Sequence, residues 1–265
     1  MTLAPDPVLL EVSNEGIAVL TLNRPEKRNA FDELVIANLA EHLETLKGAD
    51  HVRAVFIRGA GPVFCAGADI DWMRRGGERT LDDNETDALA LARMLRHLHE
   101  LPQLTVAVAH GAAMGGGAGL LAASDVAVAL KGTRIRFSEV RLGLTPATIA
   151  PFVVEAIGSR MARALFASGE EFDAAYAEKI GLVQYTVDDE AGLQTIMEHL
   201  SDLALAAAPG AVADAKALVR FVSEHKIDDG LSRETARRIA QRRASAEGKE
   251  GLAAFLEKRK AEWNS

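Results

Sequence analysis

Hydrophobic and polar positions alternate near the start of the chain in the manner of a β-hairpin. Residues 9–13 and 17–22 have strand character, and the polar turn at 14–16 joins them. Pro25 ends this unit, because proline cannot donate a hydrogen bond to a strand ladder. A helix is predicted next, since Asp32 and Glu33 suit a helix N-terminus. Its hydrophobic positions recur at helical spacing at Val35, Leu39, Leu43 and Leu46.

Short apolar segments separated by helical patterns continue through the first 190 residues. Buried strands are predicted at 54–57, 105–109, 125–129 and 134–137. Helices are predicted at 83–100 and from the glycine cluster 110–117 through Leu121. This alternation favours an α/β fold whose sheets are covered on both faces.

Strand patterns stop at about residue 190, and the rest of the chain has only helical patterns. Four helices are predicted, at 192–208, 211–224, 231–244 and 251–263. The sequence therefore predicts a mixed body at 1–190 and an all-helical region at 191–265.

Composition and charge narrow the class of protein. Aromatic residues are only 5% of a chain that is 48% hydrophobic, so small aliphatic residues must fill the core. A net charge of −8 argues against a nucleic-acid-binding surface, which needs clustered cations. Residues 1–10 lack the features of a signal peptide, and no stretch has the length of a membrane helix. The single cysteine, Cys65, cannot form an internal disulfide, which favours the cytoplasm.

Two segments rich in glycine and alanine, 64–70 and 111–119, carry candidate chemistry. Each follows a predicted buried strand and leads toward a helix, and small residues there let the backbone approach a ligand. Backbone N–H groups at helix N-termini lack partners and carry a partial positive charge. Two such groups directed at one carbonyl oxygen would stabilise an oxyanion. The alternative is that these glycines only permit tight turns. The spacing fits neither a dinucleotide fingerprint nor a P-loop.

Four motifs in order along the chain resemble those of the crotonase superfamily, the enoyl-CoA hydratase/isomerase family. They are the segment 23–30, the pair 64–70 and 111–119, the segment 138–147 and the terminal segment 251–260. The resemblance implies a crotonase fold of the ClpP-like spiral type, in which ββα repeats precede an all-helical C-terminal trimerisation region. Residues 1–190 would form the acyl-CoA-binding core, and residues 191–265 would form the oligomerisation region.

The resemblance also implies roles for individual residues. The backbone amides of Ala68 and Gly116 would hold a thioester oxygen, and Glu139 would move the proton at the α-carbon. Taken alone, a loop glutamate would more often be a solvated charge or a partner of Arg141. Asp69 resembles a helix cap more than a catalyst, and Asp71 suits either the acyl pocket or a solvated first turn. The full set of predicted substrate contacts is Lys27, Arg28, Ala30, Ala66, Ala68, Asp69, Ile70, Asp71, Gly116 and Gly119.

Gly119 stands where well-studied hydratases of this family carry a second glutamate. The departure leaves three functions open: an enoyl-CoA hydratase with one carboxylate, an enoyl-CoA isomerase, and an acyl-CoA-binding protein without catalysis. The motifs around Glu139 and Gly116 resemble hydratases of branched or carboxylated enoyl-CoAs, and the room at Gly119 would admit a water or a bulkier acyl group. Both features favour the hydratase.

The remaining expectations concern the substrate's nucleotide and the assembly. Lys27, Arg28 and the run 258–260 are the candidate contacts to the phosphates of coenzyme A, which enters as part of the substrate. No other cofactor and no metal site is expected, because the histidines lack metal-ligand spacing. The family's C-terminal helices often contact the nucleotide of a neighbouring subunit, although Ala261 replaces the usual proline. A homotrimer or a dimer of trimers is expected.

Overall fold

A six-stranded sheet forms the centre of the molecule in a computed structural model that describes residues 6–264. Its strand order is β1-β2-β3-β4-β6-β9, with β1 antiparallel to β2 and the remaining pairs parallel. The strands are β1 (Val8–Val12), β2 (Ile17–Leu22), β3 (Ala54–Gly59), β4 (Leu104–Ala109), β6 (Val126–Leu130) and β9 (Tyr185–Val187). The predicted hairpin is therefore confirmed as β1 and β2.

The helices are α1 (Glu33–Lys47), α2 (Ile70–Gly76), α3 (Leu81–Glu100), α4 (Gly116–Ala123), α5 (Ala150–Ser168), α6 (Ala174–Lys179), α7 (Glu190–Ala206), α8 (Pro209–Ser223), α9 (Asp229–Ala244) and α10 (Ala246–Glu257). Three short 3-10 helices are η1 (Pro25–Lys27), η2 (Glu139–Leu142) and η3 (Glu262–Asn264). Asp32 caps α1 by accepting hydrogen bonds from the amides of Leu34 and Val35, which explains why the helix begins where the sequence predicts.

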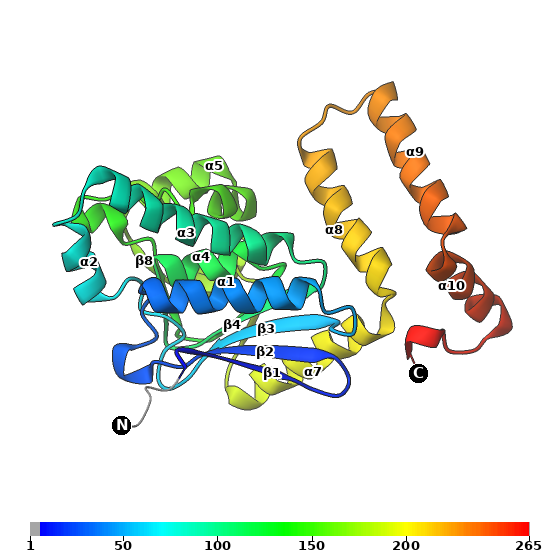
Figure 1. The fold of residues 1–265 in the computed structure, drawn as a ribbon, viewed down its shortest axis with the longest axis horizontal. Helices are drawn as coiled ribbons and strands as arrows, with labels where there is room; N and C mark the ends of the chain where they lie inside the picture. The colour runs from blue at the N-terminus through cyan, green and yellow to red at the C-terminus, as the bar shows by residue number, and fades with distance from the viewer. Residues whose placement is uncertain (1–5, 265) are drawn as a thin grey trace.

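Both faces of the large sheet are covered, as the continuous apolar strands predict. Helices α1, α3 and α4 lie on one face and α7 on the other (Figure 1). Phe56 and Val106 are buried against Leu193 and Leu200 of α7, whereas Ile57 packs into the cluster on the opposite face. Because side chains alternate along a strand, each central strand contributes to both hydrophobic clusters.

A second sheet of three short strands stands beside the glycine segments. It consists of β5 (Ala112–Met114), β7 (Arg134–Arg136) and β8 (Glu171–Asp173), in the order β5-β7-β8. β5 runs parallel to β7, and β7 runs antiparallel to β8. Ile135 and Phe172 are buried on the core face, and the residues that flank them point to the other face.

The segment 148–190 contains elements that the hydrophobic pattern does not predict. It holds α5, β8, α6 and β9. Gly158 interrupts α5 with a φ of 75°, which breaks the 3.6-residue period on which a helix prediction relies. The strands β8 and β9 are three residues long, too short to show an alternating pattern.

The region 191–265 is helical, but its helices occupy two different environments. Leu193, Leu200 and Ala204 of α7 are buried against the sheet, so this helix packs with the body. Helices α8, α9 and α10 extend away from the body as an arm (Figure 1). No described residue of α8 or α9 is fully buried in the single chain. Among the described residues, none of the helices is both long and apolar enough to cross a membrane.

Candidate active site

Backbone pairing brings together the two glycine segments that the sequence singles out. The Cys65 amide donates to the Ala112 carbonyl at 3.0 Å, and the Met114 amide donates to the Cys65 carbonyl at 3.0 Å. The second segment is joined in turn to β7, because the Gly115 amide donates to the Arg136 carbonyl at 2.9 Å. Segments that are far apart in the sequence therefore meet at one edge of the small sheet.

The carboxyl group of Glu139 lies at the junction of these segments. A Cβ atom built on Gly115 would be 3.3 Å from Oε1 of Glu139 and 4.0 Å from the Cα of Gly67. Gly115 therefore lies next to both the carboxylate and the first glycine segment. A side chain at this position would contact both.

Each predicted amide donor directly follows a glycine with positive φ. Gly67 has a φ of 96° and precedes Ala68, and Gly115 has a φ of 49° and precedes Gly116. L-residues rarely adopt such angles, so glycine sets the orientation of the next peptide group at low cost. Within residues 6–264, no group accepts a hydrogen bond from the N–H of Ala68 or Gly116. Both are free to bind a ligand oxygen.

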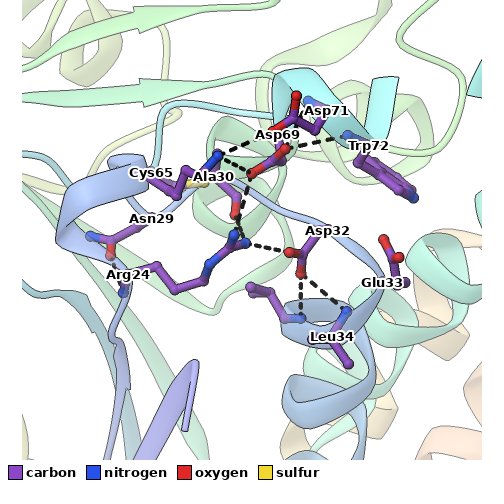
Figure 2. Close-up of polar contacts among 12 residues, drawn as sticks. Arg24, Asn29, Ala30, Asp32, Glu33, Leu34, Cys65, Asp69, Asp71 and Trp72 are labelled. Carbon is purple, nitrogen blue, oxygen red and sulfur yellow. Dashed lines mark hydrogen bonds and ion pairs between the residues drawn. The ribbon is translucent and has the colours of Figure 1, made fainter. Parts of the chain in front are cut away.

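Arg24 connects the glycine segment 64–70 to the loop 23–32 through hydrogen bonds (Figure 2). Its guanidinium donates to Asp32 at 2.6 Å, to the Ala30 carbonyl at 3.2 Å and to Asp69 at 3.3 Å. Asp69 is 6% exposed and caps α2 by accepting from the amides of Asp71 and Trp72, as predicted from its position. Burial raises the pKa of Asp69, but these amides, Lys27 and Arg24 outweigh it and hold the pKa below its ordinary value.

Asn29 holds the same loop from the other side. Its Oδ1 accepts from the Arg24 amide at 2.9 Å, and its Nδ2 donates to the carbonyls of Ala60 and Val63 at 2.8 Å each. Asn29 has a φ of 55°, a conformation that asparagine tolerates better than most residues. Neither Arg24 nor Asn29 is singled out by sequence reasoning, because their roles depend on partners distant in the chain.

Glu139 begins η2, and Phe137 and Ser138 connect it to the end of β7. Its Oε2 is buried and has no hydrogen-bond partner among the described residues. This desolvation raises the pKa of the Glu139 carboxyl above its ordinary value. The alternative ion pair with Arg141 does not form, because the Arg141 Nε donates to the Gly169 carbonyl at 2.8 Å. A half-buried carboxyl without an ion partner is suited to proton transfer.

The space expected at Gly119 is not present, which corrects that prediction. Gly119 is buried in α4, and a Cβ atom there would lie 2.5 Å from Cγ2 of Ile149. Ile149 is 1% exposed, and it fills the volume that a second glutamate would need. Neither a water nor an acyl group has room beside Gly119.

The remaining predicted contacts surround the first donor segment. Ala30 is buried beneath the loop, and the Ala66 amide donates to the Arg28 carbonyl. Ile70 opens α2 with 70% of its surface exposed, so it is available to a ligand. Asp71 is exposed, which matches the solvated first-turn alternative.

The predicted phosphate contacts differ in whether their positive charge is paired with a carboxylate of the same chain. Lys27 lies 3.3 Å from Asp71 and 3.8 Å from Asp69, whereas Arg28 forms no ion pair within the described chain. Arg259 pairs with Glu250 and Glu257. The run 258–260 follows α10, on the opposite side of the molecule from α2 (Figure 1).

Two other polar positions have structural roles. Cys65 is fully buried, and burial raises the pKa of its thiol to about 12, which excludes it as a nucleophile. Asp125 accepts from the amide and hydroxyl of Thr105 and pairs with Lys216 of α8, so it joins the sheet to the arm. The described residues contain no cluster of three or more side chains arranged to hold a metal ion.

Comparison with known proteins identifies the family. Residues 12–265 match the family model described as enoyl-CoA hydratase/isomerase, so the chain belongs to that family, and its fold is the crotonase fold. The enoyl-CoA hydratase AKT6-1 of Alternaria alternata is 30% identical, over 92% of this chain and 80% of its own. The 1,2-epoxyphenylacetyl-CoA isomerase of Escherichia coli is 29% identical, over 95% and 96%. The crystal structure of an enoyl-CoA hydratase from Shewanella pealeana superposes with a TM-score of 0.93 at 36% identity, over 97% and 96%.

Proposed function

We propose that this protein is an enoyl-CoA hydratase that adds water across the 2,3 double bond of an enoyl-CoA. In this proposal the N–H groups of Ala68 and Gly116 bind the thioester oxygen, and Glu139 transfers the proton. The observation that carries the proposal is that the Glu139 carboxyl and Gly67 both lie beside Gly115, and that Gly67 and Gly115 precede the two free amides.

The reaction needs a stabilised thioester enolate. Attack of a water oxygen on C3 moves the electron pair of the double bond toward the thioester oxygen, where negative charge develops. Two backbone donors aimed at that oxygen lower the barrier, and the loss of one such donor costs about 3 kcal/mol in other enzymes. Because these amides lack partners in the described chain, binding the oxygen breaks no existing hydrogen bond.

Glu139 completes the proton balance. As a carboxylate it accepts one proton from the attacking water, and the new C–O bond forms at C3. The protonated carboxyl then donates that proton to C2, which collapses the enolate to the saturated thioester. Desolvation raises the pKa of Glu139, and a raised pKa stabilises the protonated form that this second step requires.

Because Ile149 occupies the space beside Gly119, one carboxylate must carry out both transfers. An isomerase would use the same groups, removing a proton at one carbon and returning it at another. The relative from Escherichia coli, an isomerase by name, supports that alternative. A binding protein without catalysis is the third possibility.

Substrate binding and assembly follow the same proposal. Arg28 and Lys27 would contact the phosphates of coenzyme A. The run 258–260 lies far from the site in its own chain, so it would reach the nucleotide of a neighbouring subunit (Figure 1).

Exposed hydrophobic residues on the arm, among them Val219, Phe255 and Leu256, support a homotrimer or a dimer of trimers. A single free, buried cysteine suits the cytoplasm.

The test is incubation with a trans-2-enoyl-CoA followed by mass spectrometry. A gain of one water supports hydration, and loss of the conjugated thioester absorbance without a mass change supports the isomerase. Glu139→Gln should lower turnover by roughly 10²–10⁴-fold, the range for a general acid–base group. Glu178→Gln, at an exposed position of α6, is the matched control. Undiminished turnover in the Glu139 variant would contradict the proposal that Glu139 transfers the proton.

A further inference from the structure

Three arginines line a single cavity beside the candidate active site. The cavity has a volume of about 300 Å³, and Arg28, Arg134 and Arg136 contribute to its wall. Its other lining residues include Ala66, Met114 and Ser138. These three residues immediately precede Gly67, Gly115 and Glu139 in the sequence. The cavity therefore adjoins the candidate active site along all three of its segments.

The register of the small sheet explains why two of these arginines share a face. Arg134 pairs with Ala112 of β5, and Arg136 pairs with Met114. Ile135, between them, points into the core, so the two arginines must point the other way. Ala112, the partner of Arg134, has only a methyl side chain and lines the same cavity.

The charges in the cavity are not balanced. Arg136 pairs with Glu171 at 3.2 Å, and its Nε is buried without a partner in the described chain. Neither Arg28 nor Arg134 forms an ion pair with any described residue. The cavity wall therefore carries three cations and one anion, an excess of positive charge in a chain whose net charge is −8.

We propose that this cavity binds an anionic group of the thioester substrate, either a carboxylate or a phosphate, through Arg134 and Arg136. The proposal rests on the proposed function, because it takes the substrate to be a coenzyme A thioester. Arginine binds both groups through paired N–H donors. Arg136 is half-buried at the cavity wall, and Arg134 is exposed and without an ion partner in the described chain. Ala66 and Met114 line the cavity, and Ala68 and Gly116 follow them two residues later, so the cavity and the two free amides are neighbours. The same molecule can therefore occupy both sites.

Two sources of the anion exist, and three non-reacting ligands distinguish them. Glutaryl-CoA carries a distal carboxylate and phosphates, pentanoyl-CoA carries phosphates alone, and the pentanoyl thioester of pantetheine carries neither. Inhibition constants for each ligand are measured with the wild type and with Arg134→Gln and Arg136→Gln. Arg163→Gln, at an exposed position of α5 without an ion pair in the described chain, is the control. Thermal unfolding of every variant confirms that it is folded.

Each cavity variant is expected to weaken binding of the anionic ligand roughly tenfold, the effect of one lost charge-assisted hydrogen bond. Weakening confined to glutaryl-CoA identifies a carboxylate, and equal weakening of both CoA thioesters identifies a phosphate. Weakening of all three ligands equally, or of none beyond the Arg163→Gln control, would overturn the proposal. These measurements need no turnover, so a wild type that does not hydrate enoyl-CoA would refute the proposed function and leave this test valid.

Discussion

Replacement of Gly119 by alanine tests whether packing prevents a second carboxylate from occupying α4. The added Cβ would lie 2.5 Å from Cγ2 and 3.2 Å from Cβ of Ile149, and 3.5 Å from Cδ1 of Leu95. Carbon atoms attract best at about 3.5–4.0 Å, so the contacts with Ile149 are repulsive. Overpacking of this kind costs about 1–3 kcal/mol. Alanine recovers about 1 kcal/mol of helix propensity over glycine. A contact as short as 2.5 Å lies at the costly end of the range, so we expect a net loss of about 2 kcal/mol.

The assay is equilibrium unfolding in urea, with a double-mutant cycle that includes Ile149→Ala. That single variant is expected to cost about 2–5 kcal/mol, because Ile149 is buried and its removal leaves a cavity. In the double variant the methyl group added at position 119 enters that cavity, so the loss should be smaller than the sum of the single losses by at least about 1 kcal/mol. Gly48→Ala is the control, since its Cβ would meet nothing closer than 3.8 Å.

Strict additivity of the two changes, or a Gly119→Ala variant as stable as the wild type, would refute the steric argument. If the argument holds, Gly119→Glu alone is expected to unfold the protein or displace α4, and it should not add a second catalytic carboxylate. The single-carboxylate site is then a consequence of the side chain at position 149 as much as of the glycine.

Further predictions concern the carboxyl, the loop and the thiol. Because burial raises the pKa of Glu139, the folded state binds more protons than the unfolded state, and stability falls as pH rises from about 4.5 to the folded pKa. Urea unfolding across that interval should show Glu139→Gln gaining stability relative to the wild type, and a constant difference would contradict the desolvation. Arg24→Ala leaves Asp69 buried without its guanidinium partner, so the free energy of unfolding should fall by about 3 kcal/mol. Arg24→Lys keeps a positive charge and should lose less stability. Thermal melting of the two variants measures the difference, and equal melting temperatures would contradict a role for the charge. Cys65 should resist thiol reagents in the folded protein and react only after denaturation, so rapid labelling in buffer would show that the segment opens.

Local patterns predicted the elements whose periodicity and capping residues lie within the element itself. The hairpin β1–β2, the capped helix α1 and the helices α7, α8 and α9 follow from periodicity and capping residues. The last helix was predicted at 251–263, but α10 begins at Ala246, where Ser245 caps it, and ends at Glu257. Elements in 148–190 did not follow, because Gly158 breaks the period of α5 and the strands β8 and β9 are held by partners distant in the chain. Asp69 could be predicted as a cap because its partners are two and three residues away.

The amino-acid sequence by itself determined the segments that carry the chemistry: small residues at two strand-to-helix turns, and a glutamate after a strand. Whether those segments meet is decided by pairing between β5, β7 and the first glycine segment, because hydrogen-bond partners far apart in the chain leave no local pattern. The tertiary structure alone also decided that Ile149 fills the space beside Gly119 and that Arg134 and Arg136 share one cavity. Free volume and net local charge depend on which side chains the fold brings together, and a residue's neighbours in sequence do not specify them.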